Sequence, residues 1–282
     1  GNDGHAERPE APFFALVLRG NVGPEIFRAG QAFIERLAFA PEVEIGESFD
    51  LPGAAQAITA DARILIPMDE LIDREKELAR LEAMKEFERE YDGCSLICGV
   101  DEAGRGPLAG PVAAGAVILP KDCMILYLND SKKLSEKRRE ELFWEIREKA
   151  VSYSVGIVGP ERIDEINILQ ATYEAMRQAV SGLGVVPDLL LNDAVTIPEL
   201  AIPQVPIIKG DAKSVSIAAA SILAKVTRDH RMEEYDRQFP QYGFAKHKGY
   251  GTAAHVAAIR EFGPCPIHRR SFLKNILGEN GK

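Results

Sequence analysis

Two apolar runs with no helical pattern between them constrain the fold of this chain most strongly. They are Leu96–Val100 and Val112–Leu119, and each has the length of a buried strand bounded by turn residues. Because the connection is too short for a crossover helix, the two runs are predicted to pair as antiparallel strands.

After this pair, strand-like and helical patterns alternate along the chain. Strands are expected at 152–158, 188–192 and 205–209, and helices at 135–150, 161–181, 213–235 and 252–261. An antiparallel start followed by such alternation is typical of a mixed sheet with helices on both faces. The sequence therefore predicts an α/β fold for the part of the chain that follows Gly93.

The preceding part differs in charge and pattern. Residues 1–92 contain 10 Lys and Arg against 20 Asp and Glu. We expect a small α+β appendage at 1–67, a linking amphipathic helix at 68–92 in which Leu71, Leu78 and Leu81 recur at helical spacing, and a separate domain at 93–282.

Composition also limits where the protein works and what it binds. No apolar run approaches the roughly 20 residues that cross a bilayer. Phe13–Leu18 lacks the basic leader of a signal peptide. Four cysteines in 282 residues are too few for a disulfide framework, so we expect reduced thiols in a cytoplasmic protein. Residues 209–282 contain 13 basic and 7 acidic side chains, which suits a polyanionic partner or, alternatively, an unevenly charged solvated surface.

Carboxylates follow three of the apolar runs. Asp101 and Glu102 come directly after the first run, Asp193 ends the run at 189–191, and Asp211 follows the run at 206–209. Taken singly, Asp193 could be a turn residue and Asp211 a helix N-cap. Their shared position at strand ends favours a cluster, and a divalent cation would relieve its repulsion. Oxygen ligands without a nearby His or Cys pair favour Mg²⁺ or Mn²⁺.

A glycine-rich loop follows the first two acids. Gly104-Arg105-Gly106-Pro107 is too short for a phosphate-binding P-loop and lacks its Lys-Ser/Thr ending. Glycines let a backbone approach a ligand closely, and Arg105 can contact a phosphate or a sugar. The alternative interpretation is an ordinary hairpin turn.

Four sequence blocks together closely resemble bacterial ribonuclease HII. They are DEAGRGPLAGP at 101–111, NDSKKLS at 129–135, IKGDAKSVSIAAASILAKVTRD at 208–229 and KHKGYGT at 246–252, within a match from about Arg80 to Leu273. The resemblance implies an RNase H-like fold and an endonuclease that cuts the RNA strand of an RNA/DNA hybrid or a lone ribonucleotide in duplex DNA.

The resemblance also implies roles for particular residues. Asp101, Glu102, Asp193 and Asp211 would be the catalytic metal ligands, whereas Gly104, Arg105, Gly106 and Tyr250 would recognise the ribose 2′-hydroxyl. We expect two Mg²⁺ or Mn²⁺ ions, with Asp101 bridging them, and incision on the 5′ side of the ribonucleotide that leaves 3′-hydroxyl and 5′-phosphate ends. The sequence departs from the family at Asn192, where an aliphatic residue is usual, and a buried amide there needs a partner.

Basic residues outside these motifs are candidates for holding phosphates. Lys225 and Arg228 share a stripe of the predicted helix with Ser214 and Ala218, and Lys132 precedes another helix. Core packing of the alanine face and a simple helix entry are the alternatives. His247, His255 and His268 are too far apart to indicate a metal triad, and they are expected to be surface or structural residues.

A second resemblance concerns residues 32–82, which are similar to the C-terminal region of valyl-tRNA synthetase. It leaves open a non-catalytic RNA-binding or interaction protein that uses this segment. A junction resolvase would share the acid cluster without needing the tyrosine. We expect a monomer that acts on nucleic acid duplexes.

Overall fold

The computed structural model describes residues 68–278 of the chain. The predicted appendage at 1–67 lies outside the described residues, and so does most of the synthetase-like stretch at 32–82. From Glu77 onward the chain forms one compact unit.

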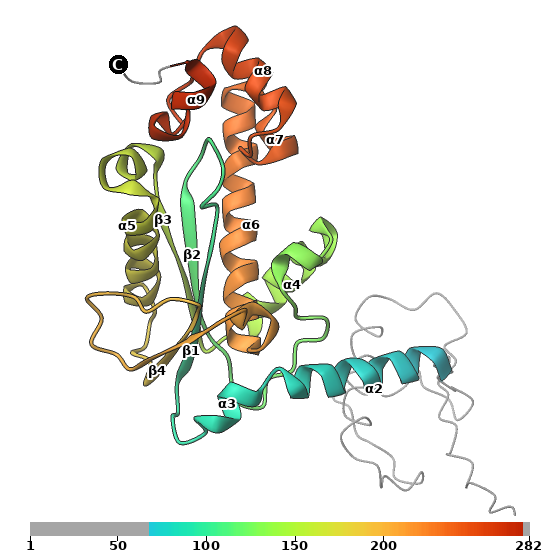
Figure 1. Cartoon of the computed structure of the whole chain (residues 1–282). Coiled ribbons are helices and arrows are strands. Elements are labelled where there is room, and N and C mark those ends of the chain that lie inside the picture. The colour runs from blue at the N-terminus through green and yellow to red at the C-terminus, as the bar shows by residue number, and fades with distance from the viewer. Residues whose placement is uncertain (1–67, 279–282) are drawn as a thin grey trace, which may run out of the picture. The chain divides into compact units, whose positions relative to one another are not determined.

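A mixed five-stranded sheet forms the centre of this unit, in the order β3-β2-β1-β4-β5 (Figure 1). The strands are β1 Ile97–Ala103, β2 Val112–Ile118, β3 Ser152–Val158, β4 Leu189–Asp193 and β5 Gln204–Ile207. β1 and β2 pair antiparallel, as do β2 and β3, whereas β4 runs parallel to both β1 and β5. The predicted antiparallel start and the mixed sheet are confirmed.

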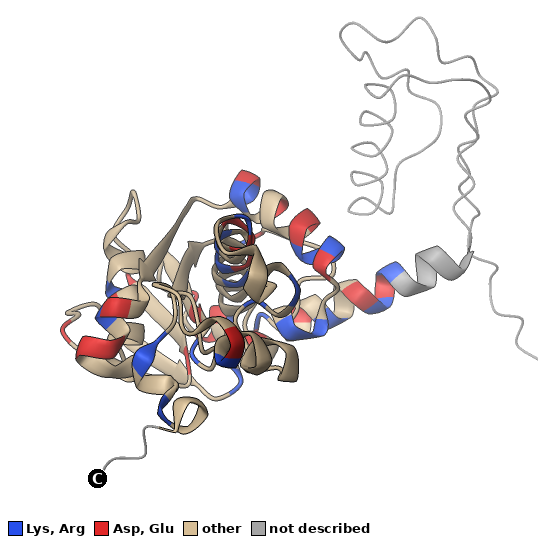
Figure 2. Ribbon diagram, turned by 90° about the horizontal axis from the view of Figure 1, so that it is seen from above, with Lys and Arg blue, Asp and Glu red and all other residues tan. Residues whose placement is uncertain are grey.

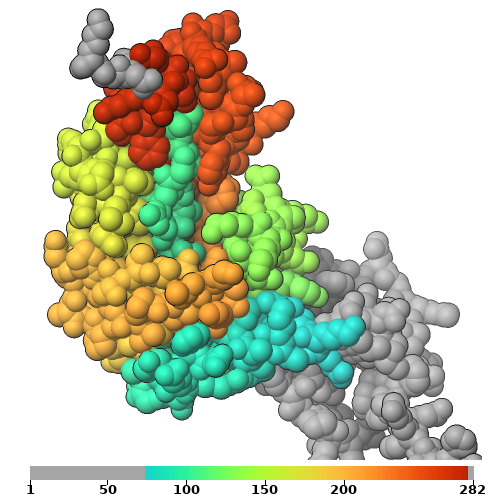
Figure 3. All heavy atoms as spheres, in the orientation of Figure 1, coloured from blue at the N-terminus to red at the C-terminus, as the bar shows by residue number. Residues whose placement is uncertain are grey.

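Helices cover both faces of the sheet. α5 (Pro160–Ser181) lies on one face, and α6 (Val215–Gln238) with α4 (Glu136–Lys149) on the other. The short helices α7 (Phe244–His247), α8 (Ala253–Phe262) and α9 (Lys274–Leu277) gather beyond one end of the β1–β2 hairpin (Figure 3). No helix within residues 68–278 is long and apolar enough to span a membrane.

The helices begin where their polar side chains cap the free N–H groups. Ser135, Ser214 and Thr252 accept hydrogen bonds from the amides three residues ahead, at the starts of α4, α6 and α8. The first amides of a helix have no partner within it, and these side chains supply an acceptor for one of them at each helix entry. The cap of α6 is therefore Ser214, and Asp211 is not its N-cap.

α6 packs against the sheet at two glycines. A Cβ atom at Gly99 of β1 would lie 2.0 Å from the backbone carbon of Ser216, and one at Gly115 of β2 would lie 2.4 Å from the carbonyl oxygen of Ala220. Real side chains do not fit at such separations, so main chain packs directly on main chain here. The start of α6 is thereby held against the strand that carries Asp101.

The segment predicted as one linking helix is two helices, α2 (Met68–Ala83) and α3 (Glu86–Glu90). Leu81 and Met84 are buried in the core beneath α4 and α6. Glu88 of α3 accepts hydrogen bonds from the Ser214 hydroxyl at 2.6 Å and the Ser216 amide at 3.1 Å. This second part of the segment packs onto the sheet unit because its apolar face and Glu88 both find partners there.

Candidate active site

The only charged residues within the five strands are Asp101 and Glu102 of β1 and Asp193 of β4. Figure 2 shows that the other charged residues of the described chain gather on helices and loops. β1 and β4 are parallel, with Val100 opposite Asn192, so their acids leave the sheet at the same edge. We call Asp101, Glu102, Asp193 and Asp211 the acid edge.

Asp211 reaches this edge because the chain turns sharply after β5. Lys209 adopts a left-handed conformation with a φ of 58°, and a short 3₁₀ helix, η2 (Gly210–Ala212), follows. The amide of Gly210 donates to Asp193 Oδ1 at 2.7 Å. One carboxylate oxygen from each of Asp101, Asp193 and Asp211 lies within 4.8 Å of the others.

Glu102 is the member of the acid edge outside this group of three. Successive strand residues point to opposite faces, so the Glu102 side chain starts from the other face of β1, yet its charge still raises the pKa of Asp101. Its Oε1 accepts a hydrogen bond from Arg105 at 3.2 Å, and its amide donates to Asp101 Oδ1 at 2.7 Å. The structure thus brings three of the four predicted ligands together and holds the fourth beside them.

Burial raises the pKa values of Asp101, Glu102 and Asp211, and negative neighbours raise them further. The pKa of Asp101 lies well above its usual value, first because the group is buried and then because Glu102 and Asp193 are negatively charged. Burial also raises the pKa of Glu102, against the opposing effect of Arg105. Burial and the charge of Asp130 raise the pKa of Asp211.

A divalent cation fits this donor set. Three hard oxygen donors converge, and a cation would offset the repulsion between their negative charges. Lys132 Nζ lies 3.9 Å from Asp211 Oδ2, with its side chain 75% exposed. Burial lowers the pKa of Lys132, but the charges of Asp101 and Asp130 raise it by more, so the pKa lies above its ordinary value. Lys132 therefore remains a cation at the rim of the site.

The glycine-rich loop and Tyr250 lie side by side. A Cβ atom on Gly106 would be 3.9 Å from the Tyr250 ring, and the amide of Leu108 donates to the carbonyl of Gly249 at 2.8 Å. Tyr250 is 45% exposed, so its ring is open to solvent. Arg105 links this loop to the acid edge through Glu102.

The burial of Arg228 conflicts with its predicted role as a phosphate contact. Its side chain is buried, and its guanidinium donates to the carbonyls of Pro111, Lys248 and Ala109 at 2.9, 2.9 and 3.2 Å. With these donors occupied inside the protein, Arg228 has no free fork for a phosphate. A helical stripe predicts which residues share a face, but it does not show whether solvent or another loop covers that face.

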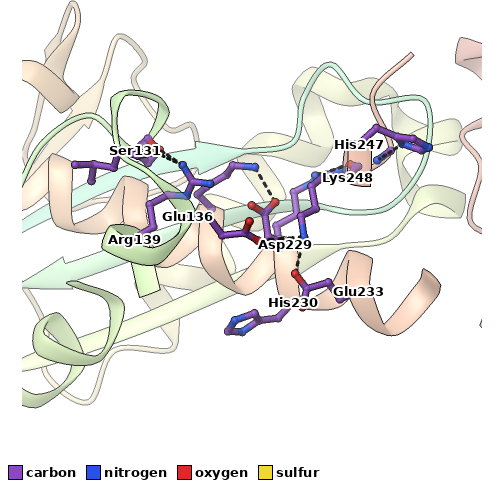
Figure 4. Close-up of polar contacts among 12 residues, drawn as sticks. Ser131, Glu136, Arg139, Asp229, His230, Glu233, His247 and Lys248 are labelled. Carbon is purple, nitrogen blue, oxygen red and sulfur yellow. Dashed lines mark hydrogen bonds and ion pairs between the residues drawn. The ribbon is translucent and has the colours of Figure 1, made fainter. Parts of the chain in front are cut away.

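Lys225 is also engaged within the protein. Its Nζ contacts Asp229 Oδ1 at 2.7 Å, and its side chain is 19% exposed. Burial lowers its pKa more than Asp229 raises it. Figure 4 shows the neighbouring polar contacts, in which Lys248 binds Glu233 at 2.5 Å. Among the three predicted phosphate contacts, Lys132 alone is exposed beside the acids.

His255 and His268 form a chain of hydrogen bonds, the histidine chain, despite their separation in the sequence. The amide of Cys265 donates to Nδ1 of His268, so Nε2 of His268 carries the proton and donates to Nε2 of His255 at 3.0 Å. Nδ1 of His255 then donates to the carbonyl of Tyr250 at 2.9 Å. The ring of His247 stacks on that of His255. His255 and His268 are buried, so the structural alternative holds for them and the surface alternative is wrong.

Sequence reasoning missed Arg269. This arginine is buried and donates to the carbonyls of Gly104, Arg105, Gly110 and Pro111. Its neighbour Arg270 is exposed. Nothing in the local sequence separates two adjacent arginines, and only the structure shows which of them turns inward.

The sheet order and the carboxylates at the ends of β1 and β4 define the class of RNase H-like nucleases. The RNase H2 structure from Pyrococcus horikoshii shares this fold with a TM-score of 0.56 and 28% identity, over 65% of this chain and 98% of that one. RNase HII in the PCNA complex from Archaeoglobus fulgidus superimposes with a TM-score of 0.52, again at 28% identity, over 62% of this chain and 94% of that one.

Sequence similarity identifies the family within this class of nucleases. The family model for ribonuclease HII matches residues 98–275. Ribonuclease HII of Lachnoclostridium phytofermentans is 68% identical over 200 residues, covering 71% of this chain and 79% of that protein. The Clostridioides difficile protein is 61% identical over 72% of this chain and 80% of that protein. The chain belongs to the ribonuclease HII family, and it is an endoribonuclease that acts on RNA/DNA hybrids.

Proposed function

We propose that this enzyme incises duplexes on the 5′ side of a ribonucleotide, both in RNA/DNA hybrids and at single ribonucleotides in DNA. Three observations on neighbouring residues support the proposal. Carboxylate oxygens of Asp101, Asp193 and Asp211 converge within 4.8 Å, the glycine-rich loop continues from the same strand, and Tyr250 lies beside Gly106. The convergence of the three acids is the observation that carries the proposal.

Asp101, Asp193 and Asp211 would hold Mg²⁺ or Mn²⁺, with Glu102 completing the ligand set. When bound, these ions would lower the pKa of the attacking water and stabilise the leaving 3′ oxygen. The hydrogen bond from Gly210 to Asp193 fixes one ligand before the ion arrives. Lys132, exposed beside Asp211, would bind the phosphate on the solvent side.

Selection of the ribose would depend on the loop at 104–106 and on Tyr250. The Tyr250 ring is open to solvent, next to a glycine that leaves room for a sugar. A site whose polar groups bond a 2′-hydroxyl leaves them unpaired with a deoxyribose, and this rejects DNA. Tyr250→Phe should reduce the rate or the discrimination between ribonucleotide and DNA without changing cation affinity. Unchanged cleavage at the junction would count against this role.

One substrate experiment tests the proposal. A DNA duplex with one embedded ribonucleotide is incubated with and without Mg²⁺, beside an all-DNA duplex and a four-way junction. We expect cation-dependent cleavage of the first duplex alone, with 3′-hydroxyl and 5′-phosphate ends. Cleavage of the junction instead would indicate a resolvase, and binding without cleavage under any cation would indicate a non-catalytic RNA-binding protein.

We propose a monomer, in which no second copy is needed to complete the site because all four acids come from one chain. The four free cysteines support work in the reducing cytoplasm. Residues 1–67 remain proposed as an α+β appendage similar to part of valyl-tRNA synthetase. Light scattering during size-exclusion chromatography would measure the oligomeric state.

A further inference from the structure

Two arginines are buried side by side next to the glycine-rich loop, and we call Arg228 and Arg269 the arginine pair. Their residues are 1% and 0% exposed. Within the described chain neither guanidinium forms an ion pair, and every hydrogen bond that they donate ends on a backbone carbonyl. Burying two cations without a carboxylate costs free energy. We therefore take the binding of these carbonyls as the role of both arginines.

The carbonyls belong almost entirely to one loop. Arg269 binds those of Gly104 at 2.6 Å, Arg105 at 2.9 Å, Gly110 at 2.9 Å and Pro111 at 3.1 Å. Arg228 binds Pro111 as well and adds the carbonyl of Lys248. The pair therefore draws the oxygens of the loop between β1 and β2 inward and ties this loop to the segment that precedes Tyr250.

The loop glycines fit this arrangement. Gly104 has a φ of +93°, and a Cβ atom there would lie 2.0 Å from Nε of Arg228. Gly110 has a φ of +86°, and its Cβ atom would meet the sulfur of Met232 at 2.2 Å. The backbone can thus approach the guanidinium groups only without side chains at these positions.

Inward carbonyls fix the direction of the opposite amides. In a trans peptide the C=O of one residue and the N–H of the next point in opposite directions, and the described chain has no cis peptide. With the carbonyls of Gly104 and Arg105 held by Arg269, the N–H groups of Arg105 and Gly106 point away from the core. Neither amide has an acceptor among the described residues.

We infer that Arg269 is a positioning residue, which aims the amides of Arg105 and Gly106 at an oxygen of the ribonucleotide substrate. Two donors fixed in advance bind an oxygen without the cost of ordering a loop during the reaction. This inference rests on the proposed function, because it concerns the same substrate. Arg269 itself touches no substrate.

Arg269→Lys tests the inference, with Arg270→Lys as the matched control on the adjacent exposed arginine. Lysine keeps the positive charge but lacks the planar fork that spans several carbonyls. We expect kcat/KM for the single-ribonucleotide duplex to fall roughly 10- to 100-fold in Arg269→Lys and to change less than about twofold in Arg270→Lys. Calorimetric titration with Mn²⁺ should give the same affinity for both, since the acid edge is untouched.

Amide exchange supplies a measurement that does not depend on whether Arg269→Lys folds. In an Asp101→Asn chain, which keeps Arg269, NMR follows the amides of Arg105 and Gly106 with a ribonucleotide duplex and with an all-DNA duplex of the same sequence. We expect exchange to slow by at least about tenfold with the ribonucleotide duplex only, as for a newly formed hydrogen bond.

The outcomes distinguish a failure of the proposed function from a failure of the positioning role of Arg269. If the unaltered enzyme leaves the ribonucleotide duplex intact, the proposed function fails. If it cleaves that duplex while a folded Arg269→Lys enzyme cleaves equally well, or while both amides exchange as fast in the complex as without it, the inference on Arg269 is overturned.

Discussion

The acid edge and the arginine pair gather like charges in opposite ways. Asp101, Asp193 and Asp211 face one another with repulsion that raises the pKa values of Asp101 and Asp211, whereas Arg228 and Arg269 have three or four hydrogen bonds each to carbonyls. Burial alone therefore does not mark a functional charge. A charged group whose bonding capacity is used inside the protein builds the site, and one whose capacity is left open is available to a ligand.

The largest contrast should come from removing one charge of the acid edge. We expect Asp101→Asn to lower kcat by about a thousandfold, roughly 4 kcal/mol of transition-state stabilisation, while duplex binding persists. The rise in melting temperature that Mg²⁺ gives the unaltered enzyme should also disappear. Single-turnover cleavage and thermal unfolding measure these effects. Glu141→Gln, at an exposed acid paired with Arg138, is the control, and comparable losses in both variants would refute the assignment.

Loss of one member of the arginine pair should lower the free energy of unfolding. Arg228→Leu removes the donors to the carbonyls of Ala109 and Lys248, which stay buried without partners. The free energy of unfolding should fall by about 3 kcal/mol, as measured by urea denaturation. Arg231→Leu, at an exposed arginine paired with Glu234, should change it by less than about 0.5 kcal/mol. Equal values for the two variants would show that the buried bonds stabilise nothing.

The histidine chain sharpens the comparison because its members are buried without charge. Burial lowers the pKa of His255 below 6.5, and burial with the nearby His255 lowers that of His268 to about 4. The unfolded chain thus binds protons first as the pH falls, so this stabilisation is complete above pH 6.5 and is lost towards pH 4. Between pH 7 and pH 5 we expect a loss on the order of 1 kcal/mol.

Urea denaturation over that pH range measures the loss. His268→Gln should flatten the profile. A profile of the same steepness in the variant and the unaltered protein would argue against the histidine chain.

The smallest effect is expected at Asn192, which is buried next to Asp193 at the end of β4. Its Nδ2 donates to Gln204 at 2.8 Å, but its buried Oδ1 has no partner among the described residues. Asn192→Leu should raise the free energy of unfolding by about 0.5–1 kcal/mol, because an unpaired buried oxygen disappears. Gln204 keeps its bonds to Ile197, so cleavage should be unchanged. A loss of activity would mean that the amide helps to place Asp193.

Much of the sheet could be predicted because apolar runs determine buried strands. The run at 96–100 predicts β1, although the strand extends through Asp101 and Glu102 by pairing with β2. The acids could be placed at one edge because the ends of parallel neighbours meet there. The turn at Lys209, which ends β5 at Ile207 and brings Asp211 inward, has no comparable signal in the apolar pattern.

The rest depends on contacts between distant segments. Asn167 divides α5 with a φ of 68° and caps the following turn through the amides of Leu169 and Gln170, inside a pattern that looks continuously helical. Arg228 and Arg269 resemble surface residues until the loop at 104–111 covers them. Local propensity carries no information about which loop will lie over a side chain.

The direct packing of α6 on Gly99 and Gly115 has a consequence for how this enzyme can change. With no side chains between helix and sheet at these points, exchanging one apolar residue for another cannot move the beginning of α6 towards β1 or away from it. Substitutions between apolar core residues should therefore leave the spacing between Asp101 and Asp211 unchanged. Adaptation to an ion of another radius would have to come from substitutions in the turn after β5, which can change the path of the backbone.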